Sequence, residues 1–455
     1  METPRKLGFV LLGGATTGAL IKEIRFINEL AARGCECHVW WAFERNYQTE
    51  LHPSVQQRWL FHHARYASYW KAALRLPHWR QFEDFCGRQV SRFGGEPLRR
   101  RALSAFPGLV DWGFRELIIR ICRGVGEDQS LIRRFGRELT DSGVTHVFPM
   151  LEILAPFILA ARRQVPRSIG CTVTFQGYEL YTHAAHQVGL EERFLRVLRE
   201  CARESGSVPL TLSRPYANRI EREVGLSAEE LQLVAPGVPE ADPIDAGLAR
   251  QQILEQFGID VQRRPLITFL GRVDSEKGID LLLMAARILA GQGHQFQIVV
   301  CGGSAFGNTC RETCQSIARH LEIDVCWTGY VSDEMRSAVM TASHCVVYPS
   351  IHHEPFGMVP VEAMSHGTPV VVSDTGGVSE LVTWQERRAG LTFRSWDSGD
   401  LAVQLERLLT QSDLYASLKA ETRLIASKYS IARMTDEILS SIRSSADRKS
   451  TLRAA

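Results

Sequence analysis

The sequence has almost no excess of charge of either sign, with 53 Lys and Arg against 51 Asp and Glu among its 455 residues. A net charge of +2 gives no attraction of the whole molecule to nucleic acid, so we expect no nucleic-acid partner. It also lacks any apolar run near the roughly 18 residues that a membrane helix needs. The run Leu7–Leu12 resembles a signal peptide, but two glycines break it at once, which favours a buried strand in a cytoplasmic protein.

Metal-ligand spacing is also missing, although the chain has 11 cysteines. Neither Cys35 and Cys37 nor Cys310 and Cys314 have a second pair or nearby histidines at the separations that zinc sites use. The other cysteines lie in apolar runs, where they behave as small buried residues in a reducing compartment. We therefore expect no metal.

The first forty residues predict a strand, a turn, a helix and a second strand. Leu7–Leu12 is continuously apolar, as a parallel strand covered on both faces requires. A glycine-rich turn follows at 13–18, then a helical period over 19–33 and a strand at Cys37–Trp41. The turn of such a βαβ unit offers backbone N–H groups to a phosphate. Further expected strands are Val144–Pro149, Ile169–Phe175 and Val208–Leu212.

The second half restarts this alternation after residues 235–243, where three prolines and a glycine predict a linker. Strands again alternate with helices, and residues 401–443 have a wholly helical pattern. We therefore predict an α/β protein with two Rossmann-like, doubly wound domains facing each other across a cleft. The expected domains are residues 1–238 and 239–443, with a disordered tail at 444–455. The expected strands of the second domain are 265–270, 297–300, 325–327, 345–348 and 369–372.

One loop of the second domain carries two cations. The segment Gly271-Arg-Val-Asp-Ser-Glu-Lys-Gly278 follows a predicted strand, so Arg272 and Lys277 fall at the carboxyl end of that strand. A guanidinium binds two phosphate oxygens at once and an ammonium adds a point charge, so the pair suits a diphosphate. The alternative is two solvated charges on a surface loop.

A second cluster places two carboxylates around a predicted helix start. Glu354 falls in the loop before a helix that begins near Gly357, and Glu362 falls on the helix itself. Carboxylates accept hydrogen bonds from vicinal sugar hydroxyls, while the first N–H groups of the helix, at Gly357, Met358 and Val359, bind a hydroxyl or an anionic oxygen. A helix start at which the dipole favours acids is the alternative. It does not explain two acids placed so specifically.

A third glycine-bearing loop, Ser373–Gly377, again follows a strand. Together these motifs make residues 270–382 resemble the donor domain of glycosyltransferase family 4, the retaining group 1 glycosyltransferases with the GT-B fold. The signature of that family is E-x-F-G-x-x-x-x-E-A-M, followed by G-x-P-V-V and G-G-x-x-E. This chain reads HHEPFGMVPVEAMSHGTPVVVSDTGGVSEL, and the upstream element G-R-x-x-x-x-K-G matches too. In the first half the resemblance is limited to Gly13–Gly14 and Thr174–Glu179.

The resemblance implies a role for each matching position. It makes Arg272, Lys277 and Glu354 the catalytic residues, the cations neutralising the leaving diphosphate and Glu354 contacting the transferred hexose. A nucleotide-diphosphate sugar is then the co-substrate, with no cofactor and no metal, because the two cations replace the charge of a metal. The implied donor-binding residues approach the phosphates, the base or the ribose, and they are Gly14, Gly271, Tyr330, Val331, Phe356, Gly357, Met358, Val359 and Glu362.

The chain departs from the family on the acceptor side. Many relatives carry a histidine near the reacting hexose, in a T-x-H-G or T-x-H-D stretch, where this chain has Gln176. A glutamine bonds a sugar hydroxyl but does not titrate. His183 follows closely and is a second acceptor-side candidate, with an ordinary exposed helix histidine as its alternative.

A basic, aromatic insertion is expected at about 42–140. Residues 51–137 contain sixteen Lys and Arg against seven Asp and Glu, interleaved with thirteen Trp, Tyr and Phe side chains that include Trp59, Trp70 and Trp79. This composition suits peripheral contact with an anionic membrane and a lipid-linked acceptor. It equally suits an anionic acceptor, or an ordinary solvated face.

The sequence thus predicts retaining transfer of a hexose from a nucleotide sugar to an acceptor hydroxyl, in glycolipid, polysaccharide or other glycoconjugate synthesis. The acceptor is a glycan, a lipid-linked sugar or a small molecule. The alternatives are a GT-B epimerase or phosphorylase, an inactive nucleotide-sugar-binding regulator, and a dinucleotide oxidoreductase. The first glycine turn lacks the G-x-G-x-x-G spacing of the last class.

Overall fold

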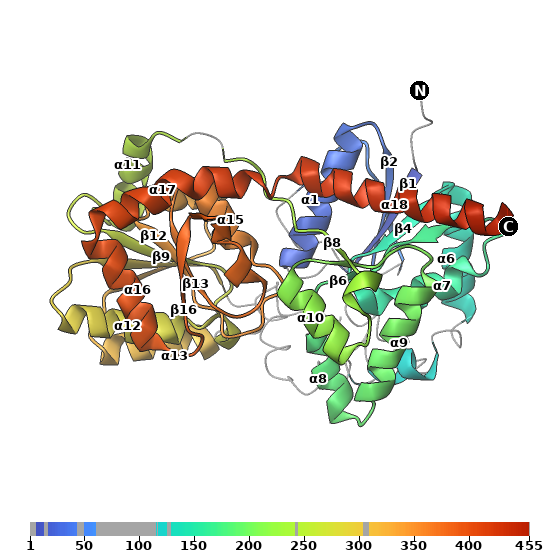
Figure 1. The fold of residues 1–455 in the computed structure, drawn as a ribbon, viewed down its shortest axis with the longest axis horizontal. Coiled ribbons are helices and arrows are strands. Elements are labelled where there is room, and N and C mark those ends of the chain that lie inside the picture. The colour runs from blue at the N-terminus through green and yellow to red at the C-terminus, as the bar shows by residue number, and fades with distance from the viewer. Residues whose placement is uncertain are drawn as a thin grey trace, which may run out of the picture. The chain divides into compact units, whose positions relative to one another are not determined.

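The chain forms two compact α/β units (Figure 1). The first comprises residues 1–211, 217–234 and 435–455, and the second comprises residues 212–216 and 235–434. Gly14 and most of the expected insertion at 42–140 lie outside the described residues. The structure is a computed structural model that describes residues 6–12, 17–42, 50–60, 115, 117–124, 129–241, 244–303 and 309–454, with only the backbone of 129–130 and 444–454.

A five-stranded parallel sheet organises the first unit, in the order β3-β2-β1-β4-β5. Its central strand β1 is apolar on both faces, and Leu7, Phe9 and Leu11 are all buried. The strands are β1 (Lys6–Leu11), β2 (Glu36–Trp41), β3 (Gln56–Trp59), β4 (His146–Pro149) and β5 (Gly170–Cys171).

The single strand expected at 169–175 is in fact two strands in different sheets. The Thr172 N–H donates to Val147 O at 3.2 Å, whereas Val173 O accepts from Leu210 N at 2.8 Å. The chain therefore changes its pairing partner after β5. The second parallel sheet of this unit contains β6 (Thr174–Phe175), β7 (Leu210–Thr211) and β8 (Gln232–Leu233).

Helices of the first unit follow the apolar periods of the sequence. In α1 (Gly18–Ala32) the Thr17 side chain caps the start by accepting from Leu20 N, and the apolar stripe through Ile24 and Ile27 is buried. The other elements are the short helix η2 (Glu152–Leu154), α6 (Gln129–Ser142), α7 (Ala155–Arg162), α8 (Glu179–Gln187), α9 (Glu191–Glu204) and most of α10 (Arg214–Glu223).

The expected end of the second domain at 443 and the disordered tail at 444–455 differ from the structure. Helix α18 runs from Ile431 to Ala454, and from Thr435 onward it belongs to the first unit. Ile438 is buried on one side of this helix, and Asp436 pairs with Arg33 of α1 at 2.5 Å. Once a helix is anchored in this way, each further residue adds one backbone hydrogen bond. The helix therefore continues even through a serine-rich, charged sequence.

Six parallel strands organise the second unit, in the order β11-β10-β9-β12-β13-β16. The first strand in sequence, β9, lies at the centre, and the order reverses between β9 and β12. Ligands of open α/β sheets bind at the carboxyl ends of the strands beside such a reversal. The strands are β9 (Leu266–Leu270), β10 (Gln297–Cys301), β11 (Val325–Gly329), β12 (Cys345–Tyr348), β13 (Val370–Ser373) and β16 (Gly390–Phe393).

The helical pattern at 401–443 corresponds to three helices. It comprises most of α16 (Ser398–Thr410), α17 (Ser412–Ser427) and the first half of α18, with breaks at Gln411 and at 428–430. The sequence analysis also missed β3, β16 and the hairpin of β14 (Thr383–Trp384) with β15 (Arg387–Arg388). The other elements of this unit are α11 (Ala246–Phe257), η4 (Ser275–Lys277), α12 (Ile279–Gly291), α13 (Thr309–His320), α14 (Asp333–Ala342), α15 (Met358–Ser365) and η5 (Gly377–Glu380).

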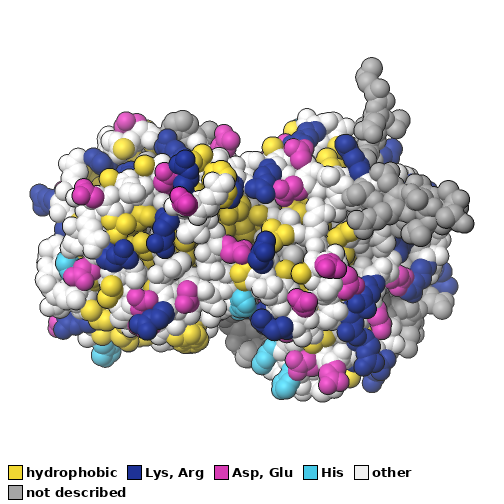
Figure 2. Space-filling view, in the orientation of Figure 1, with side chains coloured by type: hydrophobic (Ala, Val, Ile, Leu, Met, Phe, Trp, Pro, Cys, Tyr) yellow, Lys and Arg dark blue, Asp and Glu magenta, His cyan; other side chains and the backbone are white. Residues whose placement is uncertain are grey.

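Charged side chains of both signs are interspersed on the face shown in Figure 2, in keeping with the small net charge. Across the described ranges, no helix combines the length and apolar character needed to cross a membrane. Within the same part of the chain, no three His, Cys, Asp or Glu side chains gather closely enough to hold a metal ion.

Candidate donor-binding and catalytic site

Arg272 and Lys277 lie at the carboxyl end of β9, as the sequence predicts. The loop leaves β9 at Gly271 and turns through the short helix η4, which contains Lys277. The guanidinium of Arg272 contacts the carboxylates of Asp274 and Glu276, and its side chain is 28% exposed. Arg272 is therefore held in a fixed orientation and is still accessible to a ligand.

Lys277 is 7% exposed and makes a close ion pair with Glu354. Its Nζ lies 2.5 Å from Glu354 Oε2 and 3.5 Å from the Tyr348 hydroxyl. Burial lowers the pKa of Lys277, but Glu354, Tyr348 and Glu276 together outweigh it, so the pKa lies above its ordinary value. Burial raises the pKa of Glu354, but Lys277, with His352 and Arg272, outweighs it, so this pKa is lowered. Both groups are charged, and each compensates for the burial of the other.

Ser350 connects the two loops that carry this pair. Its Oγ lies 3.2 Å from the carbonyl of Glu276 and 3.3 Å from Glu354 Oε2, and the hydroxyl is buried. Gly278 has a φ of +64°, and a Cβ at this position would lie 2.1 Å from Pro349 O. The absence of a side chain at Gly278 lets the loop after β9 approach the end of β12. The sequence analysis assigned no role to Ser350 or Gly278.

The loop after β13 holds Glu354 from its other side. The Gly377 N–H donates to Glu354 O at 2.7 Å, and a Cβ on Gly376 would lie 2.6 Å from Glu354 N. The glycine pair of the G-G-x-x-E motif therefore packs against the backbone of Glu354. The structure thus brings the three glycine-bearing loops of the second unit together around one residue, Glu354.

Helix α15 starts at Gly357, whose φ of +90° turns the chain into the helix, and no side chain caps it. Glu362 is on this helix, is 5% exposed, and has its Oε2 3.3 Å from Arg336 Nη1 of α14. Phe356 is buried in an apolar cluster and makes an edge contact with Tyr429 at 5.4 Å between ring centroids. Phe356 therefore packs beneath the loop, whereas Met358 and Val359 are partly exposed at the helix start.

The predicted base-binding turn follows β11. Gly302 N donates to Gly329 O at 2.7 Å, and Val273 N donates to Gly303 O at 3.0 Å, so the loops after β9, β10 and β11 are joined by backbone hydrogen bonds. Tyr330 is 74% exposed, and a Cβ on Gly303 would lie 2.4 Å from its ring. Val331 packs against the apolar cluster that contains Leu270, and Val359 joins the same cluster.

In the first unit, Gln176 is held in a buried polar network. Its side chain is 8% exposed, its Oε1 accepts from Lys22 Nζ at 3.0 Å, and its amide nitrogen donates to the carbonyl of Met150. Lys22 also pairs with Glu23 at 2.8 Å. The sequence analysis treated Gln176 as a ligand of the acceptor, and it missed that α1 supplies two buried charges beside it.

Glu152 is fully buried next to this network. Its Oε2 accepts from Gln176 N at 3.3 Å, and its Oε1 has no hydrogen-bond partner among the described residues. Burial raises the pKa of Glu152 to about 8. His183 lies apart from this network, on the exposed side of α8, where its Nε2 is 3.1 Å from the Gln187 amide.

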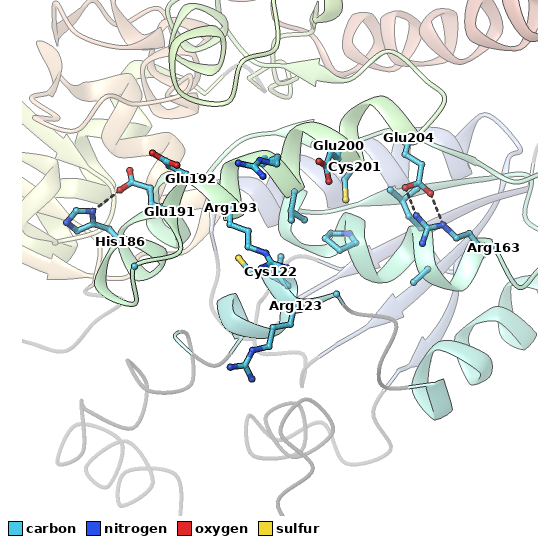
Figure 3. Close-up of a pocket in the computed structure, with 18 residues that line it drawn as sticks. Cys122, Arg123, Arg163, His186, Glu191, Glu192, Arg193, Glu200, Cys201 and Glu204 are labelled. Carbon is cyan, nitrogen blue, oxygen red and sulfur yellow. Dashed lines mark hydrogen bonds and ion pairs between the residues drawn. The ribbon is translucent and has the colours of Figure 1, made fainter.

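A groove of about 930 Å³ runs along α9 in the first unit (Figure 3). Two ion pairs lie in its lining, Arg163 with Glu204 at 2.5 Å and His186 with Glu191 at 2.7 Å. The residues that line it include none of the sequence-predicted site residues.

The second unit thus places an exposed arginine, a buried Lys–Glu pair and an uncapped helix start at the carboxyl edge of one parallel sheet. Such a set binds a diphosphate through its cations and N–H groups, and sugar hydroxyls through its carboxylates.

Comparison with known proteins agrees with this chemistry. Residues 250–425 match the family described as glycosyl transferases group 1. Alpha-D-kanosaminyltransferase of Streptomyces kanamyceticus is 27% identical over 244 residues, 53% of this chain and 61% of that protein. D-inositol 3-phosphate glycosyltransferase of Gordonia bronchialis is 31% identical over 224 residues, 48% of each protein. The chain spans about half the length of the curated relatives it matches.

Solved structures show the same fold over nearly the whole chain. The Anabaena protein HepE, in complex with UDP and glucose, matches with a TM-score of 0.69 at 17% identity, covering 97% of this chain and 100% of that one. Sucrose-phosphate synthase from Thermosynechococcus elongatus matches with a TM-score of 0.67 at 18% identity, covering 99% and 100%. The prediction of a GT-B fold with two Rossmann-like domains is confirmed.

Proposed function

Because residues 250–425 match the group 1 glycosyltransferases, we propose that this protein is a retaining hexosyltransferase that uses a nucleotide-diphosphate sugar. The observation that carries the proposal is the buried Lys277–Glu354 pair beside Arg272, at the carboxyl end of β9 and β12. A buried ion pair contributes little to stability by itself, so its position at a ligand-binding edge favours a functional role.

Each group of this edge has a proposed part in donor binding. Arg272 and Lys277 bind the diphosphate, together with the N–H groups at the start of α15. Glu362 accepts hydrogen bonds from the ribose hydroxyls, and the turn at Tyr330 and Val331 lies against the base. Lys277 and Arg272 supply the positive charge at the diphosphate, so the proposed reaction uses no metal.

The proposed reaction replaces one bond at C1 of the hexose with another on the same face. The bond between C1 and the diphosphate oxygen breaks, and its electron pair stays on that oxygen. The acceptor oxygen forms the new bond to C1, and its proton passes to the departing phosphate oxygen. Arg272 and Lys277 stabilise the developing negative charge, while Glu354 orients the hexose through a hydroxyl.

We further propose a glycan, lipid-linked or small-molecule acceptor, and peripheral contact of a cytoplasmic enzyme with anionic membrane through the basic segment at 42–140. Sixteen Lys and Arg between residues 51 and 137 support this contact. The test is flotation with phosphatidylcholine vesicles with and without anionic phosphatidylglycerol. Flotation only with the anionic lipid, lost at high salt, supports the contact, and no flotation contradicts it.

The donor site is tested by thermal unfolding with UDP, GDP, ADP, dTDP and CMP. One diphosphate should raise the unfolding temperature of the native protein, because a ligand that binds only the folded state stabilises it. The Lys277→Ala variant should lose most of this response. Arg263→Ala, which removes an exposed arginine of the same unit, should keep it. No response of the native protein to any nucleotide would contradict the proposal.

A further inference from the structure

The turn after β16 exposes a tryptophan in a backbone conformation that tryptophan rarely adopts. Trp396 has a φ of +68° and its side chain is 67% exposed. Among the described residues, only Glu322 and Gln385 share a positive φ without being glycine, and both are polar. A ligand that contacts the ring would account for an exposed tryptophan at this position.

This backbone conformation is unfavourable for any side chain. The turn is closed by Asp397 N donating to Arg394 O at 3.0 Å, which makes Trp396 its third residue. A positive φ at the third residue of a β-turn favours glycine or asparagine. For other residues the Cβ crowds the following carbonyl, and such strain persists only where surrounding contacts hold it.

Polar contacts on both sides hold this turn. The Arg394 N–H donates to Asp400 Oδ2 at 2.7 Å, and the Ser395 N–H and hydroxyl both donate to Asp374 Oδ1 at 2.9 Å. Asp397 in turn caps α16 by accepting from Asp400 N at 2.8 Å. The ring itself is left exposed, so the contacts that fix the turn do not depend on it.

The turn lies beside the loop that holds Glu354. β16 pairs with β13 in parallel, so their carboxyl ends share one edge of the sheet (Figure 1). Asp374, which binds Ser395, begins the loop that ends at Gly377, and Gly377 N donates to Glu354 O at 2.7 Å. The loop after β13 thus connects the Trp396 turn to the backbone of Glu354 in the proposed donor site.

The charges on the turn that carries Trp396 indicate which ligand the ring suits. Asp374, Asp397 and Asp400 outnumber Arg394, so an anionic ligand or an anionic membrane is disfavoured here. The other residues of the turn are all polar, whereas a protein partner needs a contiguous apolar patch. A sugar has an apolar C–H face that stacks on an aromatic ring and hydroxyls that bond to a polar rim.

We propose that Trp396 is a stacking platform for a neutral sugar residue of the acceptor glycan, with Asp374 and Arg394 as the hydroxyl-binding rim. The identity of this sugar as part of an acceptor rests on the proposed function. Binding of a sugar to the Trp396 ring does not rest on the proposed function, because it requires neither a donor nucleotide nor turnover.

The test uses the full-length protein and neutral oligosaccharides as probes, namely maltohexaose, cellohexaose, mannohexaose and galactohexaose. Protein labelled with 5-fluorotryptophan reports contact at the ring, and the Trp396 fluorine resonance is assigned by its loss in Trp396→Gly. We expect this resonance to shift with at least one probe. Saturation-transfer titrations should then show about tenfold weaker binding of that probe to Trp396→Gly, and near-native binding to Trp396→Phe.

A stability measurement separates binding from folding. Trp396→Gly relieves the unfavourable backbone, so its unfolding temperature should be unchanged or about 2 °C higher than that of the native protein. Gln385→Gly makes the same backbone change in the β14–β15 hairpin and should leave sugar binding unchanged. A fall in unfolding temperature for Trp396→Gly, no shift with any probe, or equal sugar binding by Trp396→Gly would each overturn the proposal.

The response to nucleoside diphosphates distinguishes this inference from the proposed function. Trp396→Gly should keep the thermal response to the donor nucleotide. If the protein binds the nucleotide but its Trp396 resonance shifts with no sugar, the proposed function stands and this inference is wrong. If the protein binds a sugar at Trp396 but no nucleotide, the proposed function is wrong and the sugar site stands.

Discussion

The ammonium of Lys277 and the carboxylate of Glu354 lie 2.5 Å apart, in a position that exposes neither group freely to water. The guanidinium of Arg272 is likewise paired, with Asp274 and Glu276. Both cations of the proposed donor site are therefore neutralised before any ligand binds. Under the proposed function, donor binding exchanges carboxylate contacts for phosphate contacts, so that neither cation is left uncompensated.

Removing the charge of Glu354 should destabilise the protein in the absence of a ligand. Glu354→Gln removes the close counter-charge of the buried Lys277 and leaves only the Glu276 carboxylate at 3.9 Å. We expect the free energy of unfolding to fall by about 3 kcal/mol. A nucleoside diphosphate should restore part of this loss, because its phosphates supply the missing negative charge. Urea unfolding with and without the nucleotide measures both effects.

The control for this variant is Glu255→Gln, which changes an exposed glutamate of the same unit and should unfold like the native protein. Equal stabilities of Glu354→Gln and the native protein would contradict the ion pair seen in the structure.

The proposed ribose contact of Glu362 has a test that isolates the hydroxyls. Glu362→Gln should bind the preferred nucleoside diphosphate about tenfold less tightly, because a charged hydrogen-bond acceptor is lost. Its affinity for the 2′,3′-dideoxy nucleotide should equal that of the native protein, since that ligand has no ribose hydroxyls. Calorimetric titration decides, and an equal loss with both nucleotides would show that Glu362 acts only by pairing with Arg336.

Gly278 should tolerate no side chain, because the loop that carries Lys277 touches the end of β12. Gly278→Ala should lower the free energy of unfolding by about 3 kcal/mol, from the left-handed backbone and a Cβ placed 2.1 Å from Pro349 O. Gly293→Ala is a matched control, with a φ of +90° and open space around the new Cβ. The free energy of unfolding of Gly293→Ala should fall by about 1 kcal/mol. Similar losses in the two variants, measured by urea unfolding, would contradict the close approach of the loops.

Much of the donor site follows from the sequence, because its groups are local to three strand ends. Arg272 and Lys277 follow β9 directly, and Glu354 and Glu362 lie on either side of the start of α15. The partners of these residues do not follow from the local sequence. Arg336 lies on another helix, 26 residues before Glu362, and no pattern near either residue indicates the contact.

The first unit was harder to predict for a similar reason. Lys22 and Glu23 interrupt an apolar stripe on α1, and charged residues of a helix ordinarily lie on its solvated face. Only the tertiary packing of α1 against the strand ends buries them beside Gln176. The return of α18 to the first unit depends on long-range contacts such as Arg33 with Asp436, which local propensity does not contain.

Glu152 should give the first unit a pH-dependent stability. Its pKa of about 8 in the folded protein exceeds the ordinary 4.5, so the folded state keeps a proton that the unfolded chain loses between these values. Stability should therefore fall by about 5 kcal/mol in total as the pH rises from 4.5 to 8, and stay level above that.

Glu152→Gln cannot titrate and should lack this fall, whereas Glu229→Gln, at an exposed position, should retain it. Urea unfolding at several pH values between 5 and 8.5 compares the three proteins. Parallel curves for Glu152→Gln and the native protein would show that the carboxyl does not carry the proton.

The most direct test of the account is the rate at which nucleoside diphosphate is released from a panel of nucleotide hexoses by the native protein and by Lys277→Ala. We predict release from at least one donor, slowed about a hundredfold or more in Lys277→Ala and unchanged in Arg263→Ala, because Lys277 stabilises the charge of the leaving diphosphate. An unchanged rate in Lys277→Ala would contradict the central claim that this buried cation serves the transfer reaction.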